Sequence, residues 1–450
     1  MRYTQVWLSA AAIAALTGAS QAAAETLTLS EALGVAYETN PQLQAARAGL
    51  RATDEGVAIA DSNFRPSLSV GANYGYEKIP PVFGGAPISH PLGGQVQLTQ
   101  SIFNASNFAQ QGKAKEQVKV GRAQLVAAEE TVLLDAVTAY MDVVRDEATV
   151  QLRQNNVAVL QKQRDATQEQ FRVGELTRTD VAQSQARLAG AQADLINAQG
   201  QLAISRSNFE HAIGRPAETL ESEPKLPSLP KEQQAALDQG EKFNPSLGAA
   251  RYNVKAADYG VRQAIGALLP QLSLNGAYEY TQNNPSFGPF TIHALTVTGN
   301  LNVPIYQGGA EDASVRQAKE LRSQAQLTVA DTERQVVDAV RTDWQAYTSA
   351  QATIASNEAQ VEADKVAYQG VKLEQQVGGR TILDVLNAEQ ELLNSQVALV
   401  ASKRDTAVAA YQLLSAIGTL TASSLALRVN VYDPVAHYED DAGRWVGFGD

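Results

Sequence analysis

The chain has 450 residues, of which 44% are hydrophobic and 19% charged, and its formal net charge at pH 7 is −12. It contains no cysteine, which excludes disulfide bridges, thiolate metal sites and a cysteine nucleophile. The negative net charge argues against nucleic acid as a partner. No GxxxxGK[ST] run and no HExxH pair occurs, so neither a P-loop ATPase nor a zinc protease of that type is expected.

Residues 1–24 have the composition of a secretory signal peptide. Arg2 supplies the positive start, 6–16 is apolar, and Ala22 and Ala24 stand at the small-residue positions before the expected cleavage site. This apolar run is shorter than the roughly 20 residues that a membrane-spanning helix needs. We therefore expect an exported mature chain without a spanning helix.

Two long stretches without proline predict long helices. Residues 92–215 and 305–433 lack proline and are rich in residues that favour helix. Apolar residues at three-, four- and seven-residue spacings form a helical stripe in the first stretch: Val126, Leu133, Val137, Tyr140 and Val144. The predicted helices cover about 104–172, 178–212, 308–376 and 381–417. Helices of such length are typical of coiled-coil-like assemblies.

The chain contains an internal repeat. Residues 40–76 align without a gap onto 244–280, with 16 identities in 37 positions at an offset of 204. An offset that holds over the mature chain indicates two structural copies. We place the first copy at 25–225, the second at 226–427, and a carboxy-terminal tail at 428–450. The segment that joins the copies is proline-rich and is expected to be a linker.

Each copy carries two predicted strands, at about 66–78 and 94–103 in the first copy and 270–282 and 294–306 in the second. Apolar residues alternate with small or polar ones along them, more weakly in 94–103 than in the others. This pattern fits membrane barrel strands with apolar side chains toward lipid, and equally a half-buried sheet in a soluble protein. The strand pattern alone leaves both interpretations open.

The number of strands has a consequence for assembly. Four strands cannot close a membrane barrel, because the smallest barrels have about eight. An open sheet in lipid leaves edge N–H and C=O groups unpaired, at a cost of several kcal/mol each. If the strands are membranous, several chains must therefore share one barrel. A trimer would contribute twelve strands, although composition does not fix the number three.

The sequence resembles the TolC-type outer-membrane efflux proteins over the whole mature chain. Four segments carry this resemblance: the Asn-Pro-x-Leu helix starts at 40–43 and 244–247, the Val-Gly…Thr-Asp-Val segment at 173–181, and VGGRTILDVLNAEQ at 377–390. The ending VYDPVAHY…W at 431–445 is also similar to the tail of many members. A single Val-Gly pair would carry no information, but two at matched offsets are specific.

The resemblance implies an α+β membrane protein with a long α-helical coiled-coil barrel and a transmembrane β-barrel shared between subunits. Members are homotrimers whose twelve-stranded barrel lies in outer-membrane lipid, with the helical tunnel in the periplasm and a mixed equatorial region, where we place the tail. They are exit ducts of efflux pumps or type I secretion systems. Their expected partners are a periplasmic adaptor and an inner-membrane RND-type or ABC transporter.

The two Val-Gly turns are expected at the tip of the tunnel. Val173 and Gly174 lie between the first long helix and the helix after it, and Val377 and Gly378 occupy the matching place in the second copy. Glycine suits the left-handed backbone position that ends a helix. These four residues therefore form the predicted tip turns.

Two aspartates follow these turns, and two interpretations of them coexist. In the first, Thr177 and Thr381 cap the next helices, and Asp180 and Asp384 complete capping boxes three residues later. In the second, the Asp384 side chains of three chains form a ring at the constriction. Such a ring favours cations and raises its own pKa through repulsion between like charges.

Arg380 matches the arginine that the family uses to close the gate. The resemblance gives its expected partners as Thr179 and Asp180, which a guanidinium can reach with charge-assisted bonds. A solvated turn arginine is the alternative. The chain departs from the best-known pattern at Gln375, where a tyrosine is expected, and at Asn387, where an aspartate is expected. These departures predict fewer closing links and a less acidic constriction.

Other classes of function remain as alternatives. A periplasmic coiled-coil adaptor or scaffold without a pore would share the long helices but would not need strands facing lipid. An enzyme is disfavoured, since no nucleophile–base pair or metal-ligand cluster stands out, and we expect neither cofactor nor metal. His90 and His293, at the ends of the hairpin loops, have no nearby carboxylate and are interpreted as solvated.

Overall fold

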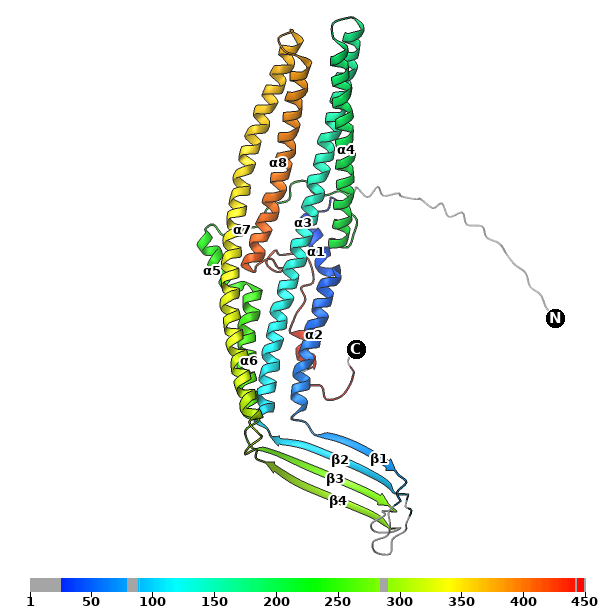
Figure 1. The fold of residues 1–450 in the computed structure, drawn as a ribbon, viewed down its shortest axis with the longest axis vertical. Coiled ribbons are helices and arrows are strands. Elements are labelled where there is room, and N and C mark those ends of the chain that lie inside the picture. The colour runs from blue at the N-terminus through cyan, green and yellow to red at the C-terminus, as the bar shows by residue number, and fades with distance from the viewer. Residues whose placement is uncertain (1–25, 79–87, 89, 284–289, 442, 449–450) are drawn as a thin grey trace, which may run out of the picture.

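A computed structural model describes residues 26–78, 88, 90–283, 290–441 and 443–448 of the chain. The predicted signal peptide at 1–24 lies outside the described residues, and so do most of the two loops that join the strands. The described chain is an elongated bundle of helices with a β-sheet at one end (Figure 1).

The helices follow the two-copy order that the repeat predicts. The first copy contains α1 (Leu29–Thr39), α2 (Pro41–Ser62), α3 (Ala105–Arg172) and α4 (Arg178–Ile213). The second contains α5 (Gln233–Phe243), α6 (Pro245–Gly266), α7 (Ala310–Gln376) and α8 (Ile382–Ile417), and a short α9 (Ala436–Asp441) lies in the tail. At about 1.5 Å per residue, the 68 residues of α3 span about 100 Å.

The helix starts explain why the two copies match. Asn40 and Asn244 each cap the helix that follows with a side-chain oxygen, and Pro41 and Pro245 occupy the first helical turn, where no N–H is needed. The amide nitrogens of Asn40 and Asn244 also donate to the carbonyl oxygens of Ala212 and Ala416, at 3.1 and 3.0 Å. The Asn-Pro pair thus ties each short helix to the end of the tip-directed helix of its own copy.

The four strands form one antiparallel sheet in the order β1-β2-β3-β4, which supports the predicted fold class. Their bounds are β1 (Ser67–Tyr74), β2 (Leu92–Phe103), β3 (Gln271–Gln282) and β4 (Thr291–Asn302). Within the described chain, β1 and β4 each pair on one side, so the sheet has two edges available to other strands.

Two strands end earlier than the sequence predicts. β1 stops at Tyr74 and β4 at Asn302, each four residues before its predicted end at 78 or 306. Asn302 pairs with Gln271, and Pro270 before it has no N–H for the ladder. At the other strand, the carbonyl oxygen of Pro91 accepts from Gly75 N at 2.9 Å, and its missing N–H ends the pairing.

The register separates an apolar face of the sheet from a polar face. Val70 lies opposite Val96, Val96 opposite Tyr278, and Tyr278 opposite Leu295, so these residues share one face. Their immediate neighbours in the chain, Gly71, Gln95, Glu279 and Ala294 among them, lie on the other face. β1 is exposed along its whole length, which a single soluble sheet would not tolerate on its apolar face.

The main hydrophobic core lies near the middle of the bundle, where α1, α3, α4 and α8 meet. Tyr140 is fully buried there against Phe209, and its hydroxyl donates to Leu27 O at 2.8 Å and accepts from Glu221 N at 2.9 Å. This one side chain therefore fixes both the start of the described chain and the segment between the copies.

The tail begins near this core and runs along α2. Tyr432 N donates to Tyr37 Oη at 3.0 Å, and further on the Arg65 guanidinium lies 5.0 Å from the ring centroid of Trp445. The tail thus extends from the middle of the bundle toward the sheet.

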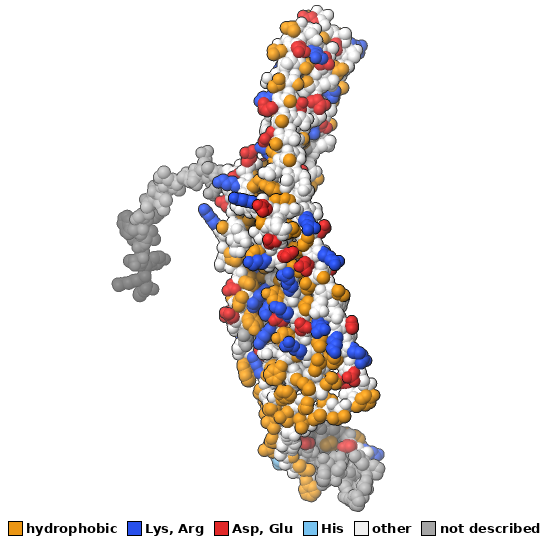
Figure 2. Space-filling model, turned by 90° about the vertical axis from the view of Figure 1, so that its left-hand side faces the viewer, with side chains coloured by type: hydrophobic (Ala, Val, Ile, Leu, Met, Phe, Trp, Pro, Cys, Tyr) orange, Lys and Arg blue, Asp and Glu red, His pale blue; other side chains and the backbone are white. Residues whose placement is uncertain are grey.

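Charged side chains spread over the helical bundle, and hydrophobic side chains gather at its end nearest the sheet (Figure 2). Among the described helices, none combines the length and apolar composition that crossing a membrane requires.

Candidate functional site

The predicted tip turns lie at the end of the bundle farthest from the sheet (Figure 1). Gly174 and Gly378 adopt φ of 89° and 81°, the left-handed region that glycine favours, as predicted. Each turn has the two hydrogen bonds of a Schellman motif. In the second copy they run from Gly378 N to Gln375 O at 3.0 Å and from Gly379 N to Glu374 O at 2.8 Å. The Val173 and Val377 side chains in these turns are exposed.

Both predicted capping boxes are present. Thr381 N and Thr381 Oγ1 donate to Asp384 Oδ2 at 3.0 and 2.8 Å, and Asp384 N donates back to Thr381 Oγ1 at 3.3 Å. Thr177 and Asp180 form the same set of bonds in the first copy. The backbone N–H of each threonine, helped by its hydroxyl, lowers the pKa of the aspartate. Both carboxylates are therefore negatively charged at neutral pH within one chain.

Arg380 pairs with a residue that the sequence did not indicate. Its Nε donates to Glu374 Oε2 at 2.9 Å across the turn, and both side chains are about half exposed. The Glu374 carboxylate raises the pKa of the guanidinium, so the pair is an ion pair at any physiological pH. Among the described residues of one chain, Arg380 is not hydrogen-bonded to the predicted partners Thr179 and Asp180, and Thr179 is exposed in the first turn of α4. The opposite charges of Glu374 and Arg380, which flank the Val-Gly-Gly turn, could have predicted this ion pair from the sequence.

Asn387, where the family pattern expects an aspartate, connects the two copies. Its Oδ1 accepts a hydrogen bond from Arg187 of α4 at 2.9 Å. A small apolar cluster lies beside this bond, formed by Leu160, Leu188, Ala191, Ile382 and Leu386. Residues 187 and 387 are 200 positions apart, so only the packing of α4 near α8 reveals the contact. Gln375, the other departure from the family pattern, holds the Schellman bond through its backbone carbonyl.

Glu389 is a further acidic residue near the tip that sequence reasoning missed. It lies on α8, five residues after Asp384, and only 8% of it is exposed. Burial raises its pKa to about 7, against the opposing effect of Lys372. Its place between Leu386 and Leu393 on the buried face of α8 was the available signal.

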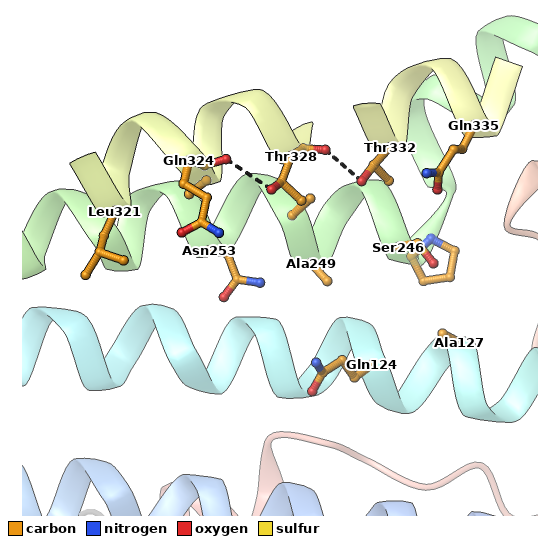
Figure 3. Close-up of a pocket in the computed structure, with 13 residues that line it drawn as sticks. Gln124, Ala127, Ser246, Ala249, Asn253, Leu321, Gln324, Thr328, Thr332 and Gln335 are labelled. Carbon is orange, nitrogen blue, oxygen red and sulfur yellow. Dashed lines mark hydrogen bonds between the residues drawn. The ribbon is translucent and has the colours of Figure 1, made fainter. Parts of the chain in front are cut away.

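One groove near the middle of the bundle does not have the chemistry of a catalytic site. It encloses about 600 Å³ between α3, α6 and α7, and Figure 3 shows its lining. The residues that line it are uncharged: Gln124, Ala127, Pro245, Ser246, Ala249, Ala250, Asn253, Leu321, Gln324, Ala325, Thr328, Thr332 and Gln335. The hydroxyls of Thr328 and Thr332 donate to carbonyls of α7 itself, at 3.0 and 2.8 Å.

No group of three or more His, Asp or Glu residues suited to a metal ion occurs in the part of the chain that the structure describes. The described features are instead a rigid polar tip, long helices, and a sheet with one apolar face and two open edges. Together they define a membrane channel protein that is built from more than one chain.

Comparison with known proteins gives the family. The protein-family model described as outer membrane efflux protein matches residues 32–215 and 236–419, one match in each copy. The chain belongs to this family. The outer membrane efflux protein BepC of Brucella suis is 34% identical over 99% of this chain and 98% of its own length. The outer membrane protein TolC of Vibrio cholerae is 26% identical over 91% of this chain and 94% of its own.

Solved structures agree on the fold. The outer membrane channel CmeC of Campylobacter jejuni superposes with a TM-score of 0.78 at 17% sequence identity, covering 92% of this chain and 89% of its own. At that identity the likeness establishes the fold.

Family membership settles the broad function. Proteins of this family are trimeric channels of the outer membrane with a periplasmic helical tunnel, and they work with adaptors and inner-membrane pumps in efflux and secretion. The chain is such an outer-membrane channel. The alternative of a poreless adaptor or scaffold finds no support in the comparisons. Family and fold are those of channels rather than of enzymes.

Proposed function

We propose that the chain is a passive exit duct that catalyses no reaction and is closed at its periplasmic tip by side-chain bonds at the two turns. The observation that carries this proposal is the arrangement of the tip. Schellman turns and capping boxes hold the backbone rigid, while the charged side chains there are exposed and able to change partners. Energy for transport then comes from the pump that docks.

We propose two kinds of closing link. The Arg187–Asn387 bond holds the tip of the first copy to that of the second within one chain. Arg380, half exposed and bound to Glu374 in the isolated chain, contacts Thr179 and Asp180 of a neighbouring hairpin in the closed trimer. A guanidinium with several donors can keep Glu374 and add a second acceptor. Docking of the adaptor would replace these bonds and let the hairpins separate.

We further propose that Asp384 forms the cation-selective ring at the constriction. Glu175→Ala is the control, because Glu175 is an exposed acid beside the first turn that belongs neither to the proposed ring nor to a proposed closing link. Asp384→Ala should shift the reversal potential in a salt gradient toward zero, while Glu175→Ala leaves it close to that of the wild type. Equal reversal potentials for wild type and Asp384→Ala would contradict the ring.

Crosslinking from a single introduced cysteine can identify the pump and the class of cargo. Because the chain lacks cysteine, Gln375→Cys places one thiol beside the tip. We would crosslink from it in living cells and identify the captured partner. A proton-driven pump with its adaptor indicates small-molecule efflux, and an ABC transporter indicates type I secretion. Capture of the duct alone would contradict docking at the tip.

A further inference from the structure

Two matching clusters of tyrosine and histidine lie at the end of the sheet farthest from the helices. In the first, the His90 ring centroid is 6.4 Å from that of Tyr74 and 5.5 Å from that of Tyr76. In the second, His293 is 6.2 Å from Tyr278 and 5.2 Å from Tyr280. We call these six residues the rim clusters. Tyr74 and Tyr76 align with Tyr278 and Tyr280 in the repeat, so each copy carries one cluster.

The register places the rim clusters on the apolar face of the sheet. His293 lies opposite Tyr280, and Tyr74, whose ring contacts that of His90, lies opposite Leu92. Paired residues share a face, and so do residues two apart in a strand. The same face carries Val70, Val96 and Leu295, so the clusters point toward the lipid when the barrel is closed.

The depth of the clusters corresponds to a membrane surface. Tyr278 and Tyr280 stand seven and nine residues beyond Gln271, where β3 begins next to the helices. At about 3.4 Å per residue and a tilt of about 40°, this is a rise of about 18–23 Å, close to the far edge of an apolar band about 25 Å tall. The clusters therefore lie at the outer-leaflet headgroups, the surface away from the periplasm.

The aromatic residues at the two ends of the sheet differ. At the end next to the helices, Phe64, Phe103 and Phe108 pack together, with neighbouring ring centroids 4.8 and 6.3 Å apart, and Tyr306 and Trp445 are exposed. The rim clusters differ in that each combines its tyrosine hydroxyls with an imidazole. An aromatic belt that served only to position the barrel would not need histidine at the outer surface alone.

Protonation would convert each cluster into a set of donors. The hydroxyl of Tyr278 and Nδ1 of His293 are 2.9 Å apart. With a neutral imidazole, Tyr278 O–H can donate to Nδ1. With an imidazolium, Nδ1–H donates to the tyrosine oxygen, and the O–H and Nε2–H bonds are both free to reach an acceptor outside the protein.

We propose that the rim clusters bind the phosphate groups of outer-leaflet lipid headgroups. A phosphate brings negative charge and several acceptor oxygens, which complement an imidazolium flanked by two phenol hydroxyls. Tyr278 and Tyr280 are the titratable groups that β3 presents to His293, since Glu279 between them lies on the other face. Tyr74, the last residue of β1, and Tyr76 contact the His90 ring, and the charged Glu77 and Lys78 follow them in the chain.

The test measures lipid binding by the intact trimer. We would purify the mature protein in a zwitterionic detergent and titrate it with diphosphoryl lipid A, counting bound lipid by native mass spectrometry at pH 5.5 and pH 8. The test variant is His90→Gln with His293→Gln. The matched control is His211→Gln, because His211 is an exposed histidine on α4. Phosphatidylcholine and inorganic phosphate serve as competing ligands.

We expect the affinity of the wild type for lipid A to fall at least fivefold in the double histidine variant, to stay unchanged in His211→Gln, and to weaken from pH 5.5 to pH 8. If the double variant does not assemble, Tyr74→Phe with Tyr278→Phe keeps the rings, removes two donors and should also weaken binding. Three results would each overturn the proposal. The first is equal affinity of the wild type and the rim-cluster variants for lipid A. The others are equal binding of phosphatidylcholine and full displacement of lipid A by equimolar inorganic phosphate.

Discussion

At the scale of single residues, the two copies share their backbone design and differ in the side chains that carry charge. Thr177 and Thr381 make the same capping box, yet positions 176 and 170, which match Arg380 and Glu374, are Leu and Gln. The turn ion pair therefore belongs to the second copy alone. Both copies share the turn, and the second copy adds an exposed ion pair to it.

Buried acids are a second residue-scale feature. Glu129 and Glu130 of α3 lie under the segment after α8, where Ala422 N donates to Glu129 Oε1 at 2.6 Å. Glu130 is 4% exposed, and its burial, reinforced by the Glu129 charge, raises its pKa to about 8 despite a bond from the Leu420 backbone.

This raised pKa gives a pH-dependent prediction. In the folded protein Glu130 is neutral at pH 5. Because its pKa is higher in the folded than in the unfolded chain, the free energy of unfolding decreases as the pH rises from about 4.5 toward 8. Glu130→Gln stays neutral, so the thermal unfolding temperature of the variant relative to wild type should rise between pH 5 and pH 9. Glu175→Gln, at an exposed position near the tip, should show no such change. The same difference at both pH values for Glu130→Gln would refute the assignment.

At the scale of elements, α3 and α7 have similar lengths but different surroundings. α3 buries twenty residues and α7 buries two, Val336 and Val340. Large apolar side chains of α7 remain exposed, among them Leu327 at 72%. In a trimer that shares its tunnel between chains, this surface is available to a neighbouring subunit.

We predict that Leu327→Asp disrupts the trimer. Burying an unpaired carboxylate between subunits costs several kcal/mol, so the variant should run mainly as monomer in size-exclusion chromatography in detergent. Leu327→Met keeps the apolar volume and should remain trimeric. A fully trimeric Leu327→Asp protein would show that this part of α7 faces water in the assembly.

The boundaries of the helices and strands also show which features of the fold the sequence predicts. Absence of proline and a helix-favouring composition predicted the long helices, and alternation predicted the four strands, because these signals are local. The offset of 204 predicted the two copies. The premature ends of β1 and β4 depended on where the partner strand stops. The contact Arg187–Asn387 and the burial of Glu130 depend on how helices pack, which no local pattern specifies. The Arg380–Glu374 pair and the burial of Glu389 did have local signals, which our predictions did not use. The tip turns themselves were predictable, because glycine and Thr-x-x-Asp patterns determine them locally.

At the scale of the whole molecule, one ionic network joins the two copies near the middle of the bundle. Arg404 of α8 donates through Nε to Asp142 Oδ1 of α3 at 2.8 Å, and Arg145 contacts both Asp142 and Asp146. Ser205 of α4 donates to Asp146 Oδ2 at 2.6 Å. Three long helices from both copies therefore meet in one network, while the tips beyond it are joined by fewer bonds. With the proposed gating, the tips would separate while this network keeps the middle of the bundle together.

We predict that Arg404→Ala lowers the thermal stability of the protein markedly. Removing a partly buried partner of Asp142 should cost about 2 kcal/mol per chain. The neighbouring Lys403 forms an exposed pair with Glu223, so Lys403→Ala should cost under about 1 kcal/mol. Equal unfolding temperatures of the two variants in the same detergent would contradict a structural role for the network.

If exchangeable side-chain bonds close the duct at its helical tip, removing one of them should open it. Single-channel conductance of the trimer in a planar lipid bilayer measures this opening. We expect a small conductance for wild type and for Arg178→Ser, an exposed arginine beside the first turn, and a severalfold larger conductance for Arg380→Ser. An unchanged, small conductance for Arg380→Ser would show that this bond does not close the duct.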